Sequence, residues 1–210
     1  MTPQEKYELA LKYYNGTEEK EKDYKKAYDL FKEAAEAGHV GSMSYLGRIF
    51  SLGNGTDLNY NKAIQWLRLA AEAGDSDAQH RLGVRYHNGE GVEKNDEEAF
   101  KWISHAAENN HGKAVYNLGL CYNYGWGTSK DYKKAYNWFS IAGNKGHKKA
   151  AILAGNLCKE GKGTDQNSIL AREWYSKAKK SQLAKHHWAS MYSFDKMFDN
   201  NNQEFIVSIR

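Results

Sequence analysis

A pattern of small, aromatic and glycine residues recurs every 36 positions through most of this 210-residue chain. Its most regular element is a Leu-Gly pair, followed by an aromatic residue and by two glycines one residue apart. The pair stands at Leu46 and Gly47, at Leu82 and Gly83, and at Leu118 and Gly119. Self-similarity at such a fixed period predicts a solenoid, in which each repeat packs only on its neighbours. We therefore expect one elongated domain.

Each repeat is predicted to form two helices. Ala78, Leu82 and Tyr86 fall on one face of a first helix with a period of 3.6 residues. This helix is expected to end at Gly89, because glycine readily adopts the positive φ of a C-terminal cap. Asp or Asn recurs where the second helices should begin, and these residue types satisfy free helix N–H groups. The predicted N-caps are Asp23, Asn59, Asn95, Asp131 and Asn167. The second helices are expected to end at Gly38, Gly74, Asn110 and Gly146.

Tryptophan and cysteine positions add to this interpretation. Tryptophan recurs with the same period, and we predict that these residues fill the core between repeats. They are Trp66, Trp102, Trp138 and Trp174. Cys121 and Cys158 lie on the first helices of neighbouring repeats, which pack about 8–10 Å apart, whereas a disulfide needs Cα atoms within roughly 7 Å. Both cysteines are therefore predicted to be buried thiols in a reducing compartment.

The pattern resembles that of the Sel-one-like repeat family, a 36-residue relative of the tetratricopeptide repeat. The resemblance covers about residues 5–185 and rests on many positions in register. In one copy they are Ala114, Leu118, Gly119, Tyr122, Gly125, Gly127, Ala135, Trp138 and Ala142. It implies an all-α fold, a right-handed α-solenoid of about five antiparallel helix pairs whose first helices line a concave groove. It also implies a scaffold or adaptor role in protein complexes.

The predicted solenoid spans residues 1–198, and its last part is a capping helix. The repeats are expected at about residues 5–41, 42–77, 78–113, 114–149 and 150–185, and the capping helix at 186–198. Residues 199–210 form an apolar, β-branched tail with two interpretations. It is either a flap that covers the exposed edge of the last repeat or a docking peptide for a partner.

No motif predicts catalysis, a cofactor or a metal site. The glycine pairs follow predicted helices, whereas a phosphate-binding loop follows a strand. His80 and His87 are seven residues apart, which is not the i, i+4 spacing of a helical zinc site. Three other histidines share one position of the repeat, just after the second helix, where we expect a capping or turn role. They are His39, His111 and His147.

The partner-binding site is predicted on the concave face, by carrying over the groove positions of the tetratricopeptide pattern. The candidate residues are Arg48, His80, His87, Lys113, Tyr116, Asn123, Tyr124 and Trp126. Aromatic side chains on a solvated wall suggest a partner that covers them, and their basic neighbours suggest that this partner offers carboxylates. Trp126, between two turn glycines, either packs on Tyr122 or Tyr124 or projects as a binding anchor.

The sequence therefore predicts a non-enzymatic, cytoplasmic scaffold that binds another protein or peptide. No apolar run is long enough for a membrane helix, and the start of the chain shows no secretory pattern. The net charge of +4 is too mild to indicate nucleic acid, and we expect no small-molecule substrate. Two alternatives follow from the resemblance. One is a cytoplasmic antidote that sequesters a toxin, and the other is a hydrolase like the cysteine-rich β-lactamase-like relatives, whose cysteine pairs this chain lacks.

Overall fold

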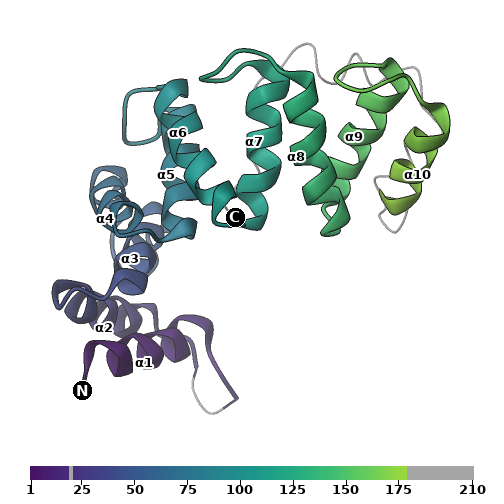
Figure 1. The fold of residues 1–210 in the computed structure, drawn as a ribbon. Helices are drawn as coiled ribbons and strands as arrows, with labels where there is room; N and C mark the ends of the chain where they lie inside the picture. Colours follow the sequence, from purple (N-terminus) through teal and green to yellow (C-terminus); the bar gives the residue numbers. More distant parts are fainter. Residues whose placement is uncertain (19–20, 179–210) are drawn as a thin grey trace. The chain divides into compact units, whose positions relative to one another are not determined.

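The computed structural model describes residues 1–18 and 21–178, and this part of the chain forms ten α-helices (Figure 1). The all-α repeat fold predicted from the sequence is confirmed. The helices are α1 (Pro3–Asn15), α2 (Tyr24–Glu36), α3 (Val40–Leu52), α4 (Tyr60–Glu72), α5 (Ser76–Asn88), α6 (Asp96–Glu108), α7 (Gly112–Tyr124), α8 (Tyr132–Asn144), α9 (Lys148–Glu160) and α10 (Ser168–Ala178).

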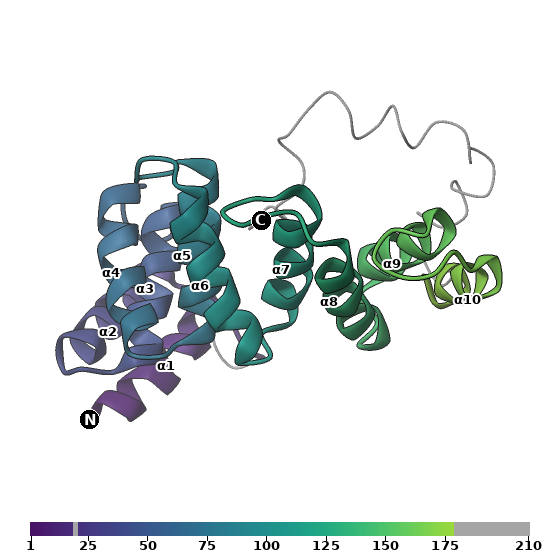
Figure 2. The ribbon, with the colours of Figure 1, turned by 45° about the horizontal axis from the view of Figure 1, so that its top comes forward.

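The helices belong to two compact units. Unit 1 (Met1–Asn109) holds α1 to α6, and the described part of unit 2 (Asn110–Arg210) holds α7 to α10. Consecutive helices pack as pairs, and Figure 2 shows α3 beside α4 and α9 beside α10. Within a unit, the second helix of one pair also packs on the first helix of the next pair. The predicted capping helix and tail, residues 186–198 and 199–210, lie outside the described residues.

Capping residues set where the second helices begin. The carboxylate of Asp23 accepts a hydrogen bond from the backbone N–H of Lys26 at the start of α2, with an N–O distance of 2.9 Å. The equivalent side chains cap the other second helices in the same way, which confirms the prediction. They are Asn59, Asn95, Asp131 and Asn167.

Residues in the left-handed conformation, with positive φ, follow both the first and the second helices of the repeats, also as predicted. Gly89 ends α5 with φ of +72°, and its N–H donates to the carbonyl of Arg85. After α6, Asn110 takes the place of a glycine, with φ of +59°. Because both ends of each helix are specified by local residues, the repeat boundaries follow from short stretches of sequence.

The two helices of a repeat approach most closely at the glycine of the Leu-Gly pair. A Cβ atom on Gly119 would lie 2.5 Å from Cε1 of the buried Phe139 ring, so any larger residue would push α7 and α8 apart. Three further repeats show the same contact. The pairs are Gly47 with Leu67, Gly83 with Ile103, and Gly155 with Tyr175. In each repeat, the large side chain that meets this glycine is the residue directly after the periodic tryptophan.

The four periodic tryptophans were predicted to be core residues, and the structure fully buries one of them. Trp174 is buried, but Trp66, Trp102 and Trp138 are only half-buried. Trp102 packs at the edge of a core cluster, and its indole N–H donates to the Glu98 carboxylate with an N–O distance of 3.1 Å. One residue along a helix turns the side chain by about 100°, so in these three repeats the next residue, Leu67, Ile103 or Phe139, is the fully buried one.

The glycine pairs of the loops are structural, as expected from their position after helices. A Cβ atom on Gly55, which has φ of +77°, would clash with the backbone carbonyl of Tyr24 in the preceding repeat. Gly163 meets Tyr132 in the same way. The second glycine of such a loop therefore lets one repeat sit on the next. Cys121 and Cys158 are both free and buried, as predicted. Among the described helices, none has the length and apolar character needed to span a membrane.

Candidate functional site

The predicted partner-binding residues are divided between the two units. Unit 1 holds Arg48, His80 and His87, on α3 and α5. The other five belong to unit 2. They are Lys113, Tyr116, Asn123, Tyr124 and Trp126. Each unit therefore carries its own part of the predicted set.

Three of these residues are not on a solvated wall, which corrects the expectation from the sequence. His80 and Tyr116 are each only 2% exposed, and His87 is 9% exposed. The Tyr116 ring stacks on the ring of His147, with centroids 4.2 Å apart, and its burial strongly raises the pKa of the phenol. His147 begins the next first helix, so this position supports the neighbouring repeat. Whether His80 and Tyr116 also contact a partner stays a prediction.

The capping role predicted for three histidines is confirmed. His39, His111 and His147 are the N-caps of α3, α7 and α9, and each accepts a backbone N–H through Nδ1. A ring nitrogen accepts a hydrogen bond only when it carries no proton, so the cap requires the neutral imidazole. Burial lowers the pKa of His39 and of His147, which favours this form.

His87 interacts with a carboxylate of its own repeat. Its Nδ1 lies 2.7 Å from the carboxylate of Asp96, the first residue of α6. Burial lowers the pKa of His87, and the nearby Asp96 carboxylate opposes this effect. The pair therefore joins the end of α5 to the start of α6.

The aromatic candidates of unit 2 lie at the end of α7. Trp126 stacks on Tyr124 with ring centroids 5.0 Å apart and an interplanar angle of 24°. Of the alternatives for Trp126, the packing arrangement on Tyr124 is therefore the one observed. Both residues and Asn123 are half-buried, and Lys113 is exposed. Burial raises the pKa of Tyr124, so its hydroxyl is a neutral hydrogen-bond donor.

A polar cavity of about 310 Å³ opens in unit 1, where α1, α3 and α5 each contribute residues. We call it the Arg48 cavity. Its main lining residues are Tyr7, Tyr45, Arg48, Asp75, Asp77 and Arg81. Of these, only Arg48 was predicted from the sequence. The cavity lies on the side of unit 1 that the first helices form, which is the side where a partner was expected.

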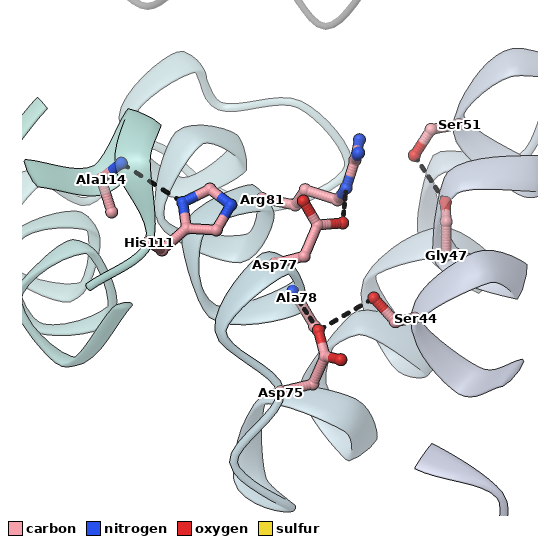
Figure 3. A network of polar contacts seen from close by, with 9 residues as sticks. All are labelled: Ser44, Gly47, Ser51, Asp75, Asp77, Ala78, Arg81, His111 and Ala114. Atoms are coloured by element: carbon pink, nitrogen blue, oxygen red, sulfur yellow. Dashed lines mark hydrogen bonds and ion pairs between the residues drawn. The ribbon is translucent and has the colours of Figure 1, made fainter. Parts of the chain in front are cut away.

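The two carboxylates of the cavity already have partners (Figure 3). Asp77 forms an ion pair with Arg81, with an N–O distance of 2.5 Å. Asp75 caps α5 by accepting the N–H of Ala78 at 2.7 Å, and it also accepts the hydroxyl of Ser44 at 3.0 Å. Neither carboxylate forms an ion pair with Arg48.

Arg48 is the cation of the cavity without a counter-charge. Its guanidinium lies 5.3 Å from the centre of the Tyr14 ring, and its Nε is buried without a hydrogen-bond partner. Among the described residues, no carboxylate comes within ion-pair distance of it. Charged groups that leave water are ordinarily paired. Arg48 therefore offers a positive charge to a group from outside the chain.

Two sequence features, seen in register, mark the position of the cavity. Gly41 lines it and has no side chain, whereas the equivalent residues of the next three repeats are charged. They are Asp77, Lys113 and Lys149. Arg48 is likewise the one charged residue among its equivalents in the five repeats. The others are Leu11, Val84, Leu120 and Asn156.

A metal site and a second cavity are the other candidates in the described part of the chain. No group of three or more His, Cys, Asp or Glu side chains suited to a metal ion occurs in residues 1–18 and 21–178. A second cavity of about 690 Å³ lies in unit 1 between α4, α6 and the loop before α6. There, Arg68 donates to the hydroxyl of Tyr86 at 2.7 Å, and Glu98 accepts from Trp102. These two pairs of lining residues are thus occupied with each other.

Comparison with known proteins identifies the repeat. The family model described as Sel1 repeat matches residues 6–39, 40–75, 76–111, 112–147 and 148–182. The chain belongs to the Sel1 repeat family. The resemblance proposed from the sequence is thereby confirmed. Sel1 repeats commonly mediate protein–protein interaction, and proteins built from them are generally non-enzymatic. No curated protein matches the chain.

Solved structures agree with this Sel1 repeat assignment. The chain is similar to c5321, a protective antigen of uropathogenic Escherichia coli, with 33% identity and a TM-score of 0.85. This match covers 92% of the chain but only 42% of c5321. A Sel1 repeat protein from Oxalobacter formigenes is 26% identical with a TM-score of 0.81, over 97% of this chain and 81% of that one. A sel1 repeat protein from Klebsiella pneumoniae, 21% identical with a TM-score of 0.54 over 90% of this chain and 92% of that one, shows the fold alone.

Proposed function

We propose that this chain is a non-enzymatic scaffold that binds a partner protein on the first-helix side of unit 1, at the Arg48 cavity. The observation that carries the proposal is the cavity itself, which holds an arginine without a counter-charge on a surface made by three different helices. Arginine beside aromatic rings is a combination that protein interfaces use often, because it buries area and keeps polar donors available.

The partner is expected to present acidic groups at this point. A carboxylate can accept two parallel hydrogen bonds from one guanidinium, which makes arginine a good residue for recognising it. The residues predicted in unit 2 form a further candidate surface, which includes the stacked Tyr124 and Trp126 and the exposed Lys113. The antidote role stays a prediction from the sequence, as does the absence of nucleic-acid and small-molecule ligands.

Site-specific photocrosslinking in the native cell tests the proposed surface. A photoreactive phenylalanine derivative at Tyr45 places the crosslinker in the cavity, and the same derivative at Tyr28 places it on α2 of the same unit. Both positions are half-buried tyrosines, so the substitutions are matched. We expect a discrete protein adduct from position 45 and none from position 28.

The adduct then gives the partner for a binding measurement. The purified partner should bind the native chain and Arg68→Gln, which removes a charge from α4, but bind Arg48→Gln at least about tenfold more weakly. Adducts from position 28 alone, or none from position 45, would place the binding surface elsewhere and overturn the proposal.

A further inference from the structure

The hydrogen-bonding groups of the Arg48 cavity are mostly donors that are still available. Tyr7 and Tyr45 line it, and within residues 1–18 and 21–178 the hydroxyl of neither forms a hydrogen bond with another side chain or the backbone. Burial raises the pKa of both phenols, so they are neutral and able to donate. Together with the Arg48 guanidinium they form a set of donors drawn from α1 and α3.

The acceptors of the cavity are already used. Asp75 accepts from Ser44 and from the start of α5, and Asp77 is paired with Arg81. A ligand that only donates would compete with these contacts. A ligand that accepts would instead meet the three available donors.

The charges limit the ligand further. Arg48 and Arg81 are balanced in number by Asp75 and Asp77, and of the two arginines that line the cavity only Arg48 lacks an ion-pair partner. One added negative charge would pair with Arg48. A second negative charge, as on a phosphoryl group, would be repelled by the two aspartates that line the same cavity. The cavity therefore suits a monoanion that accepts several hydrogen bonds.

We propose that the Arg48 cavity is a carboxylate subsite, in which Arg48, Tyr7 and Tyr45 together bind the side-chain carboxylate of an aspartate or glutamate from the partner protein. The subsite rests on the proposed function and names the chemistry by which that surface recognises its partner. Asp75, Asp77 and Arg81 hold the walls in place and exclude ligands of higher charge.

Small model compounds test the subsite without the partner. The probes are N-acetyl-glutamate N-methylamide, its glutamine analogue, N-acetyl-phosphoserine N-methylamide and N-acetylglycine, which carries a chain-terminal carboxylate. Each is titrated into the isotope-labelled full chain at pH 7, and binding is followed by amide NMR shifts near Gly41, Tyr45 and Arg48. We expect saturable shifts with the glutamate compound and none with its neutral glutamine analogue.

Matched variants then separate recognition from folding. Tyr7→Phe and Tyr45→Phe keep each ring and remove one donor, so each should weaken the glutamate compound about threefold. Arg48→Gln should weaken it at least about tenfold, whereas Arg68→Gln should leave it unchanged. An unchanged circular dichroism spectrum is the control for folding.

If the phosphoserine compound binds more tightly than the glutamate compound, the argument that the cavity selects a single negative charge is wrong. If N-acetylglycine binds more tightly, the ligand is the carboxylate of a chain terminus and not that of a side chain. If the glutamate compound binds equally to the native chain and to Arg48→Gln, the proposed carboxylate subsite is wrong. If the crosslink from position 45 still forms in that case, the proposed function stands and only the subsite fails.

Discussion

One glycine in each of four first helices, α3, α5, α7 and α9, determines how closely the two helices of a repeat can pack. Gly119 on α7 faces the ring of Phe139 on α8, and a side chain there would meet a stiff aromatic ring, which cannot bend away. Gly112 begins the same helix and is exposed, and a Cβ atom added to it would meet no other atom within 4 Å. Two glycines of one helix thus have opposite roles, and the difference lies entirely in what packs against them.

The first prediction compares these two glycines. Gly119→Ala should lower the free energy of unfolding by about 1–3 kcal/mol, because the added methyl overpacks the interface between α7 and α8. Gly112→Ala should raise it by up to about 1 kcal/mol, because alanine is the better helix former. Urea denaturation followed by circular dichroism measures both. Similar effects of the two substitutions would contradict the packing described for Gly119.

Histidine caps make the stability of the fold depend on pH. The folded state needs neutral rings at His39 and His147, and burial lowers the pKa of both, with Lys149 adding to the effect at His147. In mild acid, the unfolded chain then takes up protons before the folded chain does. The stabilisation from these caps is therefore fully present above pH 6.5 or so, the ordinary pKa of histidine, and is lost as pH falls through the folded pKa.

A second prediction isolates one of these caps. His147→Asp keeps an N-cap of the kind that Asp75 provides for α5, but it does not need a neutral ring. The variant should be less stable than the native chain at pH 7.5, because the stacking on Tyr116 is lost. Its stability should fall less between pH 7.5 and pH 5. Thermal melts at several pH values measure this, and parallel curves for the two proteins would contradict a neutral cap at His147.

At the scale of the helix, one position on three of the first helices supports the start of the next first helix. The ring of Tyr7 packs against the cap His39 with centroids 4.5 Å apart, and Tyr116 stacks on the cap His147. Where the cap is instead Asp75, the supporting residue is Ser44, which donates to the cap carboxylate. Tyrosine thus accompanies histidine, and serine accompanies aspartate.

This coupling explains which elements could be predicted from sequence. The helices, their caps such as Asp23 and their ends such as Gly89 follow from local chemistry and were predicted correctly. The burial of Tyr116 was missed, because a groove position carried over from a related repeat does not say how near the next first helix lies. The pairing of Tyr with His about 31 residues later is the signal that could have found it.

A third prediction tests the support position. Tyr116→Ala should cost about 3–5 kcal/mol, because it empties a fully buried site and removes the contact with His147. Tyr124→Ala, on the same helix, should cost only about 1 kcal/mol, since Tyr124 is half-buried and loses mainly its stacking on Trp126. Chemical denaturation measures the free energy of unfolding of both variants. Equal losses would mean that Tyr116 does not support the next repeat.

At the scale of the whole molecule, the repeat fold was predictable and the cavity was not. The 36-residue period predicts the position of each repeat. It does not predict that a cavity forms between α1, α3 and α5 where Gly41 has no side chain. Gly41 in place of a charged residue and Arg48 in place of an apolar one are visible in the sequence. That Tyr7 from α1 and Arg81 from α5 face the same space is a result of packing. Arg48 was predicted because it occupies a groove position carried over from the tetratricopeptide pattern and is basic.

The same packing between neighbours governs how stability is shared within unit 1. A solenoid is stabilised by each repeat and by its contacts with adjacent repeats. The loss of stability caused by a substitution in one repeat should therefore become smaller with distance along the stack. The helices of unit 1 contact in the order α1, α2, α3, α4, α5 and α6, without close packing of α1 on α5. Gly83 on α5 meets Ile103 of α6, and a Cβ atom there would lie 2.7 Å from Cγ1 of that side chain.

The last prediction is therefore a gradient of hydrogen exchange in the Gly83→Ala variant. The added methyl overpacks α5 against α6, and a loss of about 1–3 kcal/mol there should speed amide exchange in these helices roughly ten- to a hundredfold. The α4 helix, which packs on α5, should show a smaller increase, and α1 should exchange nearly as in the native chain. Mass spectrometry of exchange at neutral pH resolves the helices separately. A uniform increase from α1 to α6 would instead show that unit 1 opens only as a whole, and that the contacts between its repeats are too strong for any one of them to loosen alone.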